Sequence, residues 1–175
     1  AGSFDDRAKK ITKAIVKILH KAGIKYAVLG TEESCTGDPA KRAGNEFLYQ
    51  MQAMQNIMVL NGYEIKKIVT GCPHCFNILK NEYPELGGNY EVLHHTQLIN
   101  SLGADGKISI KGGGDFKGKR ITFPDPCYLG RGNNVYEAPR EVLEKLGAEL
   151  VEMKRCRTKG LCCGAGGAQM FKEAE

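Results

Sequence analysis

The grouping of the cysteines constrains this chain more than any other feature. The sequence of 175 residues contains seven cysteines, of which Cys72 and Cys75 form a C-x-x-C pair and Cys162 and Cys163 are adjacent. Seven is an odd number, and the start of the chain does not resemble a secretory signal, so a framework of disulfides is disfavoured. Grouped cysteines outside a secretory context are typical of metal or redox chemistry.

Composition indicates an ordinary globular protein. Hydrophobic residues make up 42% and charged residues 26% of the chain, which is normal for a folded domain. The net charge of +5 is mild, and the basic residues are scattered, often beside acidic ones. No basic stripe carries interleaved aromatic residues, which argues against a nucleic-acid partner. No apolar run approaches the length that a membrane span requires.

Predicted helices and strands alternate along the chain. Helical spacing of apolar residues predicts helices over 5–21, 41–60, 76–83, 96–102 and 138–146, and a last helix beginning at Met170. Short runs between turn residues predict strands over 25–29, 65–70, 90–93, 120–123 and 149–153. Residues 104–119 are rich in glycine and favour either a hairpin around 107–110 or a flexible connector. The alternation predicts an α/β fold with mainly parallel sheets.

Cysteines follow the predicted strands. Four of the predicted loops come directly after a strand, and all four carry cysteine. In parallel α/β folds, sites gather beyond the carboxyl ends of the strands. Glycine and proline flank these cysteines, and such neighbours let a backbone approach a cofactor closely and keep it stiff. Thiolates in such loops are the usual ligands of iron–sulfur clusters. The predicted ligands are Cys35, Cys72, Cys75, Cys127, Cys162 and Cys163.

Two other kinds of site remain open from the residues alone. The C-x-x-C pair also occurs as a thiol-redox pair and as half of a zinc site. A structural zinc module would need a second C-x-x-C or paired histidines, and neither is evident in the sequence. Adjacent cysteines such as Cys162 and Cys163 suit different irons of a cluster better than a single zinc ion. The alternative is therefore a structural zinc-binding or thiol-redox module without a cluster.

Four segments of the chain, residues 33–50, 71–75, 127–131 and 162–167, match one known pattern. They resemble the cysteine-rich CCG domain family, which occurs in catalytic subunits of heterodisulfide reductase, in the iron–sulfur subunits of glycolate and lactate oxidation, and in anaerobic glycerol-3-phosphate dehydrogenase. The resemblance implies two repeated Rossmann-like units with cysteine loops at the ends of strands. It places the first unit at 1–103, a glycine-rich connector at 104–118 and the second unit at 119–175.

The family motif consists of a lone cysteine, a cysteine pair followed by glycine, and a C-x-x-C. The resemblance assigns Cys35, Cys72 and Cys75 to the first copy, in which Ser34 takes the first position of the pair. It assigns Cys127, Cys162 and Cys163 to the second copy. One further cysteine would lie upstream and a further C-x-x-C downstream, so this chain would correspond to the centre of a longer protein.

By the same resemblance, the cofactors are [4Fe–4S] clusters, with a cubane at the first copy and a non-cubane cluster at the second copy of the complete protein. The implied activity is that of an iron–sulfur oxidoreductase that transfers electrons in a heterodisulfide-reductase-like or 2-hydroxy-acid-oxidising complex. Its partners would be flavoprotein or ferredoxin-like subunits, with association with a membrane subunit. The implied location is cytoplasmic, at the membrane through those partners.

Several other residues have simpler interpretations. Cys156 fits no motif position, and His94 and His95 favour helix capping or packing over ligation. Arg131 and Lys159 favour a solvated surface over the steering of an anionic substrate. The helical stripe of Met51, Met54 and Met58 is typical of a core.

Overall fold

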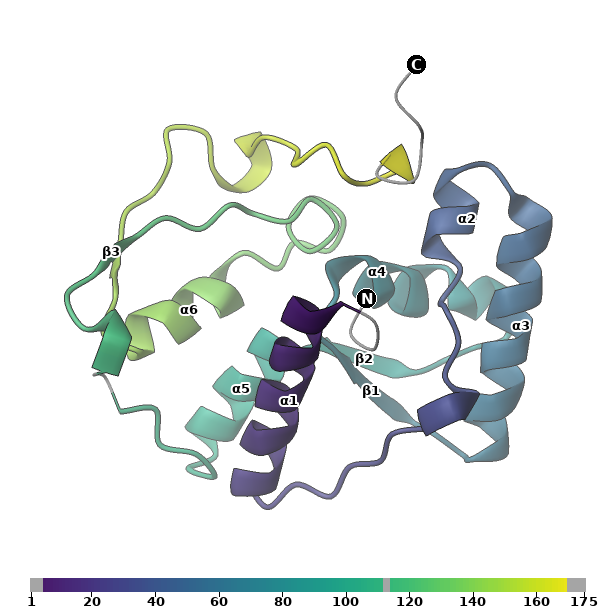
Figure 1. Cartoon of the computed structure of the whole chain (residues 1–175), viewed down its shortest axis with the longest axis horizontal. Helices are drawn as coiled ribbons and strands as arrows, with labels where there is room; N and C mark the ends of the chain where they lie inside the picture. The colour runs from purple at the N-terminus through teal and green to yellow at the C-terminus, as the bar shows by residue number, and fades with distance from the viewer. Residues whose placement is uncertain (1–4, 112–113, 170–175) are drawn as a thin grey trace.

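A computed structural model describes residues 5–111 and 114–169. The chain combines helices with two pairs of short parallel strands (Figure 1), which confirms the predicted α/β class and the parallel pairing. The helix predicted from Met170 lies outside the described residues. The elements are α1 (Asp6–Lys21), η1 (Gly30–Glu32), α2 (Asp38–Arg42), α3 (Glu46–Gly62), β1 (Lys67–Thr70), α4 (Pro73–Asn81), η2 (Tyr83–Leu86), β2 (Glu91–His94), α5 (His95–Ala104), η3 (Gly114–Phe116), β3 (Arg120–Ile121), α6 (Glu137–Lys145), β4 (Glu149–Leu150) and η4 (Arg157–Lys159).

The core forms around the first strand pair. β1 and β2 pair in parallel, with Ile68 opposite Val92 and Thr70 opposite His94. Helices α4 and α5 pack on both strands, and α3 packs on the turn η2. The buried apolar cluster contains Tyr49, Ala53, Ile57, Phe76, Ile78, Leu79, Tyr83, Val92 and Leu129. Leu129 comes from the loop of Cys127, so part of the second half of the chain is built into the core of the first.

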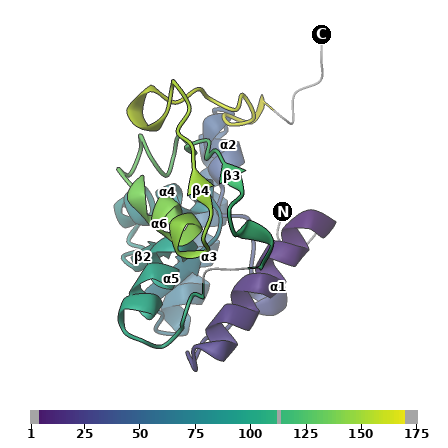
Figure 2. The same cartoon turned by 90° about the vertical axis from the view of Figure 1, so that its left-hand side faces the viewer.

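The second strand pair is smaller. β3 and β4 also pair in parallel, with Arg120 opposite Glu149 and Ile121 opposite Leu150. Helix α6 lies between them in sequence and packs on α5, where Asn100 Nδ2 donates to the carbonyl of Ala138 at 3.0 Å. After β4 the chain runs to the same end of the molecule as α2 in both views (Figures 1 and 2).

Three predicted elements are wrong in form. Residues 25–29 make no strand, and Val28 is 68% exposed, so this segment has no packed surface that would recruit it into a sheet. The helix predicted over 41–60 is two helices, because Gly44 adopts φ +84° and Asn45 then caps α3 by accepting from Leu48 N at 3.1 Å. Residues 107–110 contain no strand, so the hairpin is absent there.

The C-x-x-C pair lies on a helix, whereas the sequence placed it in a loop. Cys72 is the N-cap residue of α4, and Pro73 occupies its first turn, a position that suits proline because no intrahelical partner is lost. Within the described part of the chain, no helix combines the length and apolar character needed to cross a bilayer.

Candidate functional site

Three of the predicted ligands converge at the amino end of α4. Cys75 is half-buried in the first turn of the helix, and its Sγ accepts a hydrogen bond from Thr36 Oγ1 at 3.5 Å. A hydrogen bond with Cys75 lowers the pKa of the Cys72 thiol to about 6, and the N–H groups of Cys75 and His74 lower it further, whereas partial desolvation of the thiol acts in the opposite direction. The pKa of Cys75 is raised, first by that same hydrogen bond and then by burial, with the neighbouring Cys72 and Cys35 contributing.

The backbone beside Cys35 is held by two side chains of the first half. Asn56 of α3 donates to the Cys35 carbonyl at 2.9 Å and to the Tyr83 hydroxyl at 3.0 Å. The hydroxyl of the fully buried Tyr83 donates in turn to the carbonyl of Thr36 at 3.1 Å. Ser34 donates to Asn56 Oδ1 at 2.8 Å. Ser34, which the sequence predicts at the pair position of the motif, therefore helps to anchor the loop.

The other three predicted ligands lie at or beside a pocket. Cys127 and Cys162 line a cavity of about 440 Å³ together with Tyr128, Arg131, Gly132, Gly166 and Gly167, and Cys163 is adjacent to Cys162 in the chain. The N–H of Gly164 lies 3.4 Å from Cys162 Sγ, and this contact lowers the pKa of the Cys162 thiol, with Cys127 and Arg131 contributing. Cys162 and Cys163 are exposed and Cys127 is half-buried.

A buried arginine fixes the approach to Cys127. Both carboxylate oxygens of Asp125 accept from Arg140, at 2.6 and 2.9 Å, and Asp125 also accepts from Arg157 N at 2.6 Å. Arg140 donates as well to Glu152 at 2.5 and 3.1 Å and to the Tyr136 carbonyl at 2.7 Å. Burial acts to raise the pKa of Asp125, but the hydrogen bonds from Arg140 and Arg157 outweigh it, so the pKa is lowered.

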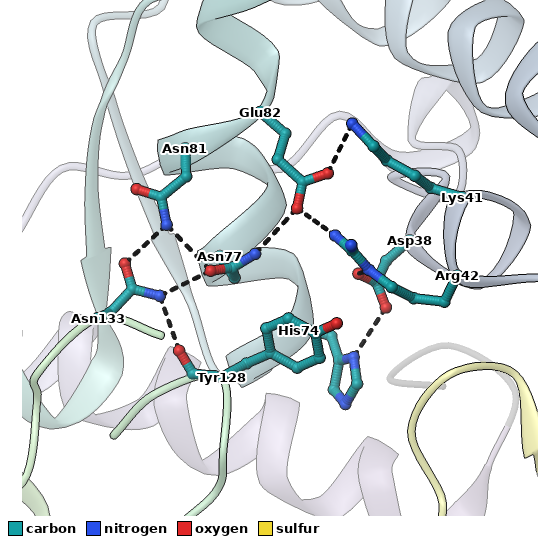
Figure 3. Close-up of polar contacts among 9 residues, drawn as sticks. All are labelled: Asp38, Lys41, Arg42, His74, Asn77, Asn81, Glu82, Tyr128 and Asn133. Atoms are coloured by element: carbon teal, nitrogen blue, oxygen red, sulfur yellow. Dashed lines mark hydrogen bonds and ion pairs between the residues drawn. The ribbon is translucent and has the colours of Figure 1, made fainter. Parts of the chain in front are cut away.

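A polar network joins the two groups of cysteines (Figure 3). His74 Nδ1 lies 2.7 Å from Asp38 Oδ2, and Arg42 donates to the other Asp38 oxygen at 3.1 Å. Arg42 also pairs with Glu82, which Lys41 contacts at 2.9 Å. Burial acts to raise the pKa of Asp38, yet His74 and Arg42 hold it below its usual value; the hydrogen bond to Asp38 in turn raises the pKa of His74.

The network continues through three asparagines to the loop of Cys127. Asn77 and Asn81 of α4 contact Asn133, with Asn133 Nδ2 donating to Asn77 Oδ1 at 2.9 Å and Asn81 Nδ2 donating to Asn133 Oδ1 at 3.0 Å. Asn133 also donates to the Tyr128 carbonyl at 2.7 Å. The Tyr128 ring packs on His74 with centroids 4.5 Å apart. Helix α4 and its N-cap therefore carry two cysteines of one group and hold the loop of the other.

The cysteines of neither group form a complete metal-binding site in this structure. Among the described residues, no group of three or more His, Cys, Asp or Glu side chains lies close enough together to hold a metal ion. All seven thiols are free. No cysteine of either group acts on Cys156, and burial and the nearby Glu152 raise the pKa of its thiol.

The structure confirms some of the simpler interpretations of the remaining residues and contradicts one. His94 is the N-cap residue of α5 and is 4% exposed, with its Nδ1 2.8 Å from Thr96 Oγ1, so the capping interpretation is confirmed. Lys159 lies on the exposed surface, whereas Arg131 lines the cavity beside Cys127 and Cys162 and donates to the Gly160 carbonyl at 2.6 Å. The core interpretation of the methionine stripe is wrong: Met51, Met54 and Met58 are 53%, 55% and 72% exposed.

Sequence reasoning missed the charged residues that hold the cysteine loops, Asp38, Arg42, Glu82, Asp125 and Arg140. Their partners are separated from them by up to 40 positions, which periodicity cannot detect. One local signal was present: an Asp-Pro dipeptide follows Cys35 and another precedes Cys127.

Comparison with known proteins identifies the family. The model of the cysteine-rich domain family, CCG, matches residues 3–80 and 121–175. The chain belongs to this family. The resemblance predicted from the cysteine loops is confirmed, and the match is interrupted over a stretch that includes the glycine-rich segment.

Curated relatives of this CCG-family chain are longer proteins. It is 47% identical over 175 residues to "EtfAB:quinone oxidoreductase" of Syntrophomonas wolfei subsp. wolfei, covering 100% of this chain and 24% of that protein. It is 46% identical to "Probable iron-sulfur-binding oxidoreductase FadF" of Bacillus subtilis, and the match covers 99% of this chain and 24% of that protein. It is 38% identical to a heterodisulfide reductase subunit of Methanosarcina barkeri, and the match covers 88% of this chain and 39% of that protein. The chain spans about a quarter of the length of the first two. No solved structure matches it significantly.

Proposed function

We propose that this chain is an iron–sulfur module that transfers electrons within an oxidoreductase. The observation that carries the proposal is the gathering of six cysteines into two groups, one at the amino end of α4 and one around the cavity that Cys127 and Cys162 line. Relatives that cover the whole chain are named for iron–sulfur binding or for electron transfer to a quinone. Both lines of support point to the same chemistry.

The donor set fits iron–sulfur clusters in kind. Thiolates are the usual ligands of such clusters, and each group supplies three of the four that a cubane takes. Hydrogen bonds to cluster sulfurs tune the reduction potential. The N–H of Gly164 and those at the start of α4 already contact the thiols of Cys162 and Cys72. A bound cluster would supply one-electron chemistry at each group.

We assign a [4Fe–4S] cubane to Cys35, Cys72 and Cys75. Cys127, Cys162 and Cys163 are assigned to a second cluster, which is of the non-cubane type when the ligand set is complete. The first site then takes one further thiolate and the second site two, all from outside these six residues. Cys156 stays outside both sites.

The two sites belong to two repeated Rossmann-like units, 1–103 and 119–175, joined by the connector 104–118. In support, each unit contains one parallel strand pair with a helix between its strands in sequence, α4 between β1 and β2 and α6 between β3 and β4. The redox partners we infer are electron-carrying proteins, a flavoprotein or a ferredoxin-like subunit. Association with a membrane subunit stays a prediction.

Anaerobic reconstitution with iron and sulfide tests the proposal. We expect the purified chain to bind iron and sulfide together and to give an EPR signal of a reduced cluster. Cys35→Ala and Cys163→Ala should each lower the iron and sulfide content and change the signal. Cys156→Ala, a matched control outside both groups, should leave both measurements at the wild-type level.

Two results would overturn the assignment. Stoichiometric zinc without sulfide would indicate a structural metal module. A chain that binds no metal but forms one reversible disulfide between Cys72 and Cys75 would indicate a thiol-redox protein. A longer natural polypeptide that contains this chain would provide the remaining ligands, and the same measurements on it would show how many thiolates each cluster takes.

A further inference from the structure

The loops of the two cysteine groups touch one another. Cys35 lines a pocket of about 310 Å³ to which Ala168, from the glycine-rich loop after Cys163, also contributes. The backbone of Gly166 passes so close to His74 that an added Cβ would lie 3.4 Å from His74 Cε1. Both views place this segment at the α2 end of the molecule (Figures 1 and 2). His74 is therefore one of the points at which the two groups meet.

The His74 ring is fixed from several sides. Its Nδ1 contacts Asp38, a residue only 6% exposed in its side chain, which Arg42 holds from the other side. The ring meets the Tyr128 ring at a centroid distance of 4.5 Å, and the Arg42 guanidinium lies 5.3 Å from the centre of that same tyrosine ring. Figure 3 shows His74 beside Asp38 and Tyr128. The ring cannot turn without breaking its hydrogen bond to the buried Asp38 carboxylate.

A second attachment holds the loop of Cys127 on α4. Asn133 bonds both to Asn77 of that helix and to the Tyr128 carbonyl. Within the loop, Gly132 N donates to the Cys127 carbonyl at 2.9 Å, and Leu129 is buried in the core. Two independent contacts, one aromatic and one amide, thus tie Cys127 to the helix that begins at the C-x-x-C pair.

We propose that His74 is a positioning residue for both cluster sites: held by Asp38, its ring packs between Tyr128 and the loop at Gly166 and fixes the separation of the two clusters. This inference rests on the proposed function. Electron transfer between cofactors falls steeply with distance, so a fixed separation keeps the rate between them constant. The histidine of the C-x-x-C therefore serves the second site as much as its own.

The experiment uses His74→Phe, which keeps an aromatic ring against Tyr128 but loses the bond to Asp38. Asn133→Ala removes the second attachment without touching a cysteine. His74→Asn retains a polar atom near the Nδ1 position and should restore part of the effect. Asn61→Ala is the matched control, because it removes an exposed hydrogen bond to Tyr90 and no contact with either cysteine group.

Two readouts are compared. In the reconstituted and reduced protein, EPR measures the magnetic interaction between the clusters; we expect His74→Phe and Asn133→Ala to keep the wild-type iron and sulfide content but to lose the wild-type interaction. In the metal-free chain, amide hydrogen exchange of residues 127–135 measures the attachment of the loop. We expect faster exchange in both variants, an intermediate rate in His74→Asn and no change in Asn61→Ala.

The outcomes separate the two proposals. If the wild-type chain assembles no cluster, the proposed function fails, and the exchange rates alone decide whether His74 holds the loop. If two clusters assemble without interacting, or if His74→Phe preserves both the interaction and the exchange rates, the positioning role is overturned. A His74→Phe protein that does not fold leaves Asn133→Ala and His74→Asn to decide by the same two measurements.

Discussion

Replacing Arg140 by methionine should destabilise the second half of the molecule more than the loss of any surface ion pair. The Arg140 and Asp125 side chains are 3% and 2% exposed, and two hydrogen bonds join them. Methionine fills a similar volume but leaves the Asp125 carboxylate buried without its cation. Removing one partner of a buried pair costs about 3–5 kcal/mol.

The structure places the cost near the lower end of that range. Asp125 keeps one hydrogen bond, from Arg157 N at 2.6 Å. Glu152, the other partner of Arg140, is 35% exposed in its side chain and can be solvated when Arg140 is removed. Loss of the Arg140–Glu152 pair should therefore lower the unfolding free energy by under about 1 kcal/mol. We therefore expect Arg140→Met to lower the free energy of unfolding by about 3 kcal/mol at pH 7.

Urea unfolding followed by far-UV circular dichroism measures this loss. Arg120→Met is the control, because the Arg120–Glu149 pair spans 3.7 Å with side chains 71% and 64% exposed, and it should cost less than about 1 kcal/mol. Equal losses in the two variants would refute the reasoning, since burial would then make no difference.

Acid provides a second test of the same pair. The pKa of Asp125 is held below its usual 3.8 in the folded protein, so the pair contributes its stability above pH 3.8 and loses it as the pH falls through the folded value. In Arg140→Met the buried carboxylate is instead stabilised by protonation. The difference in unfolding free energy between the two proteins should therefore narrow as the pH approaches 3.8. A constant difference would contradict the assignment of the loss to Asp125.

Two further predictions concern the metal-free chain. Burial and the neighbouring His95 lower the pKa of His94 from 6.5 to about 4, so the unfolded chain takes up a proton that the folded protein does not. Acidification from pH 7 to 5 should then reduce the unfolding free energy by about 2 kcal/mol through His94, and His94→Gln should remove that part of the urea-measured slope. Gly37→Ala should lower the free energy of unfolding by about 2 kcal/mol more than Gly23→Ala does. Both glycines have positive φ, but a Cβ at Gly37 would lie 2.8 Å from the Tyr49 ring, whereas Gly23 faces open space. Equal losses of unfolding free energy in urea would contradict the clash.

The sequence was most informative where periodicity and local chemistry agree. The amphipathic pattern over 5–21 predicted α1 (Asp6–Lys21) almost to the residue, and the runs at 65–70 and 90–93 predicted the parallel pair β1 and β2. The run at 25–29 has similar residues but pairs with neither strand of that sheet, and its Val28 is 68% exposed. Strand formation depends on a partner that the sequence of the strand does not specify.

The contacts that hold the cysteines in place could not be predicted in the same way. Asn133 and Asn77 are 56 positions apart, and Asp38 and His74 are 36 apart. No rule of spacing connects such pairs. The exposed methionines of α3 were misplaced for a related reason: their helical stripe indicates an apolar face, but nothing in the stripe determines whether another element covers it.

Both cysteine groups use the same physical device. Asp38 lies three residues after Cys35 and Asp125 two residues before Cys127; each is buried, each precedes a proline, and each binds an arginine from a helix, Arg42 or Arg140. Buried ion pairs contribute little net stability, because desolvation offsets their attraction. Their directional hydrogen bonds instead hold a backbone in one geometry. Such a device is expected where a loop must keep a thiolate in position before its cofactor arrives, and both loops have it within three residues of the cysteine.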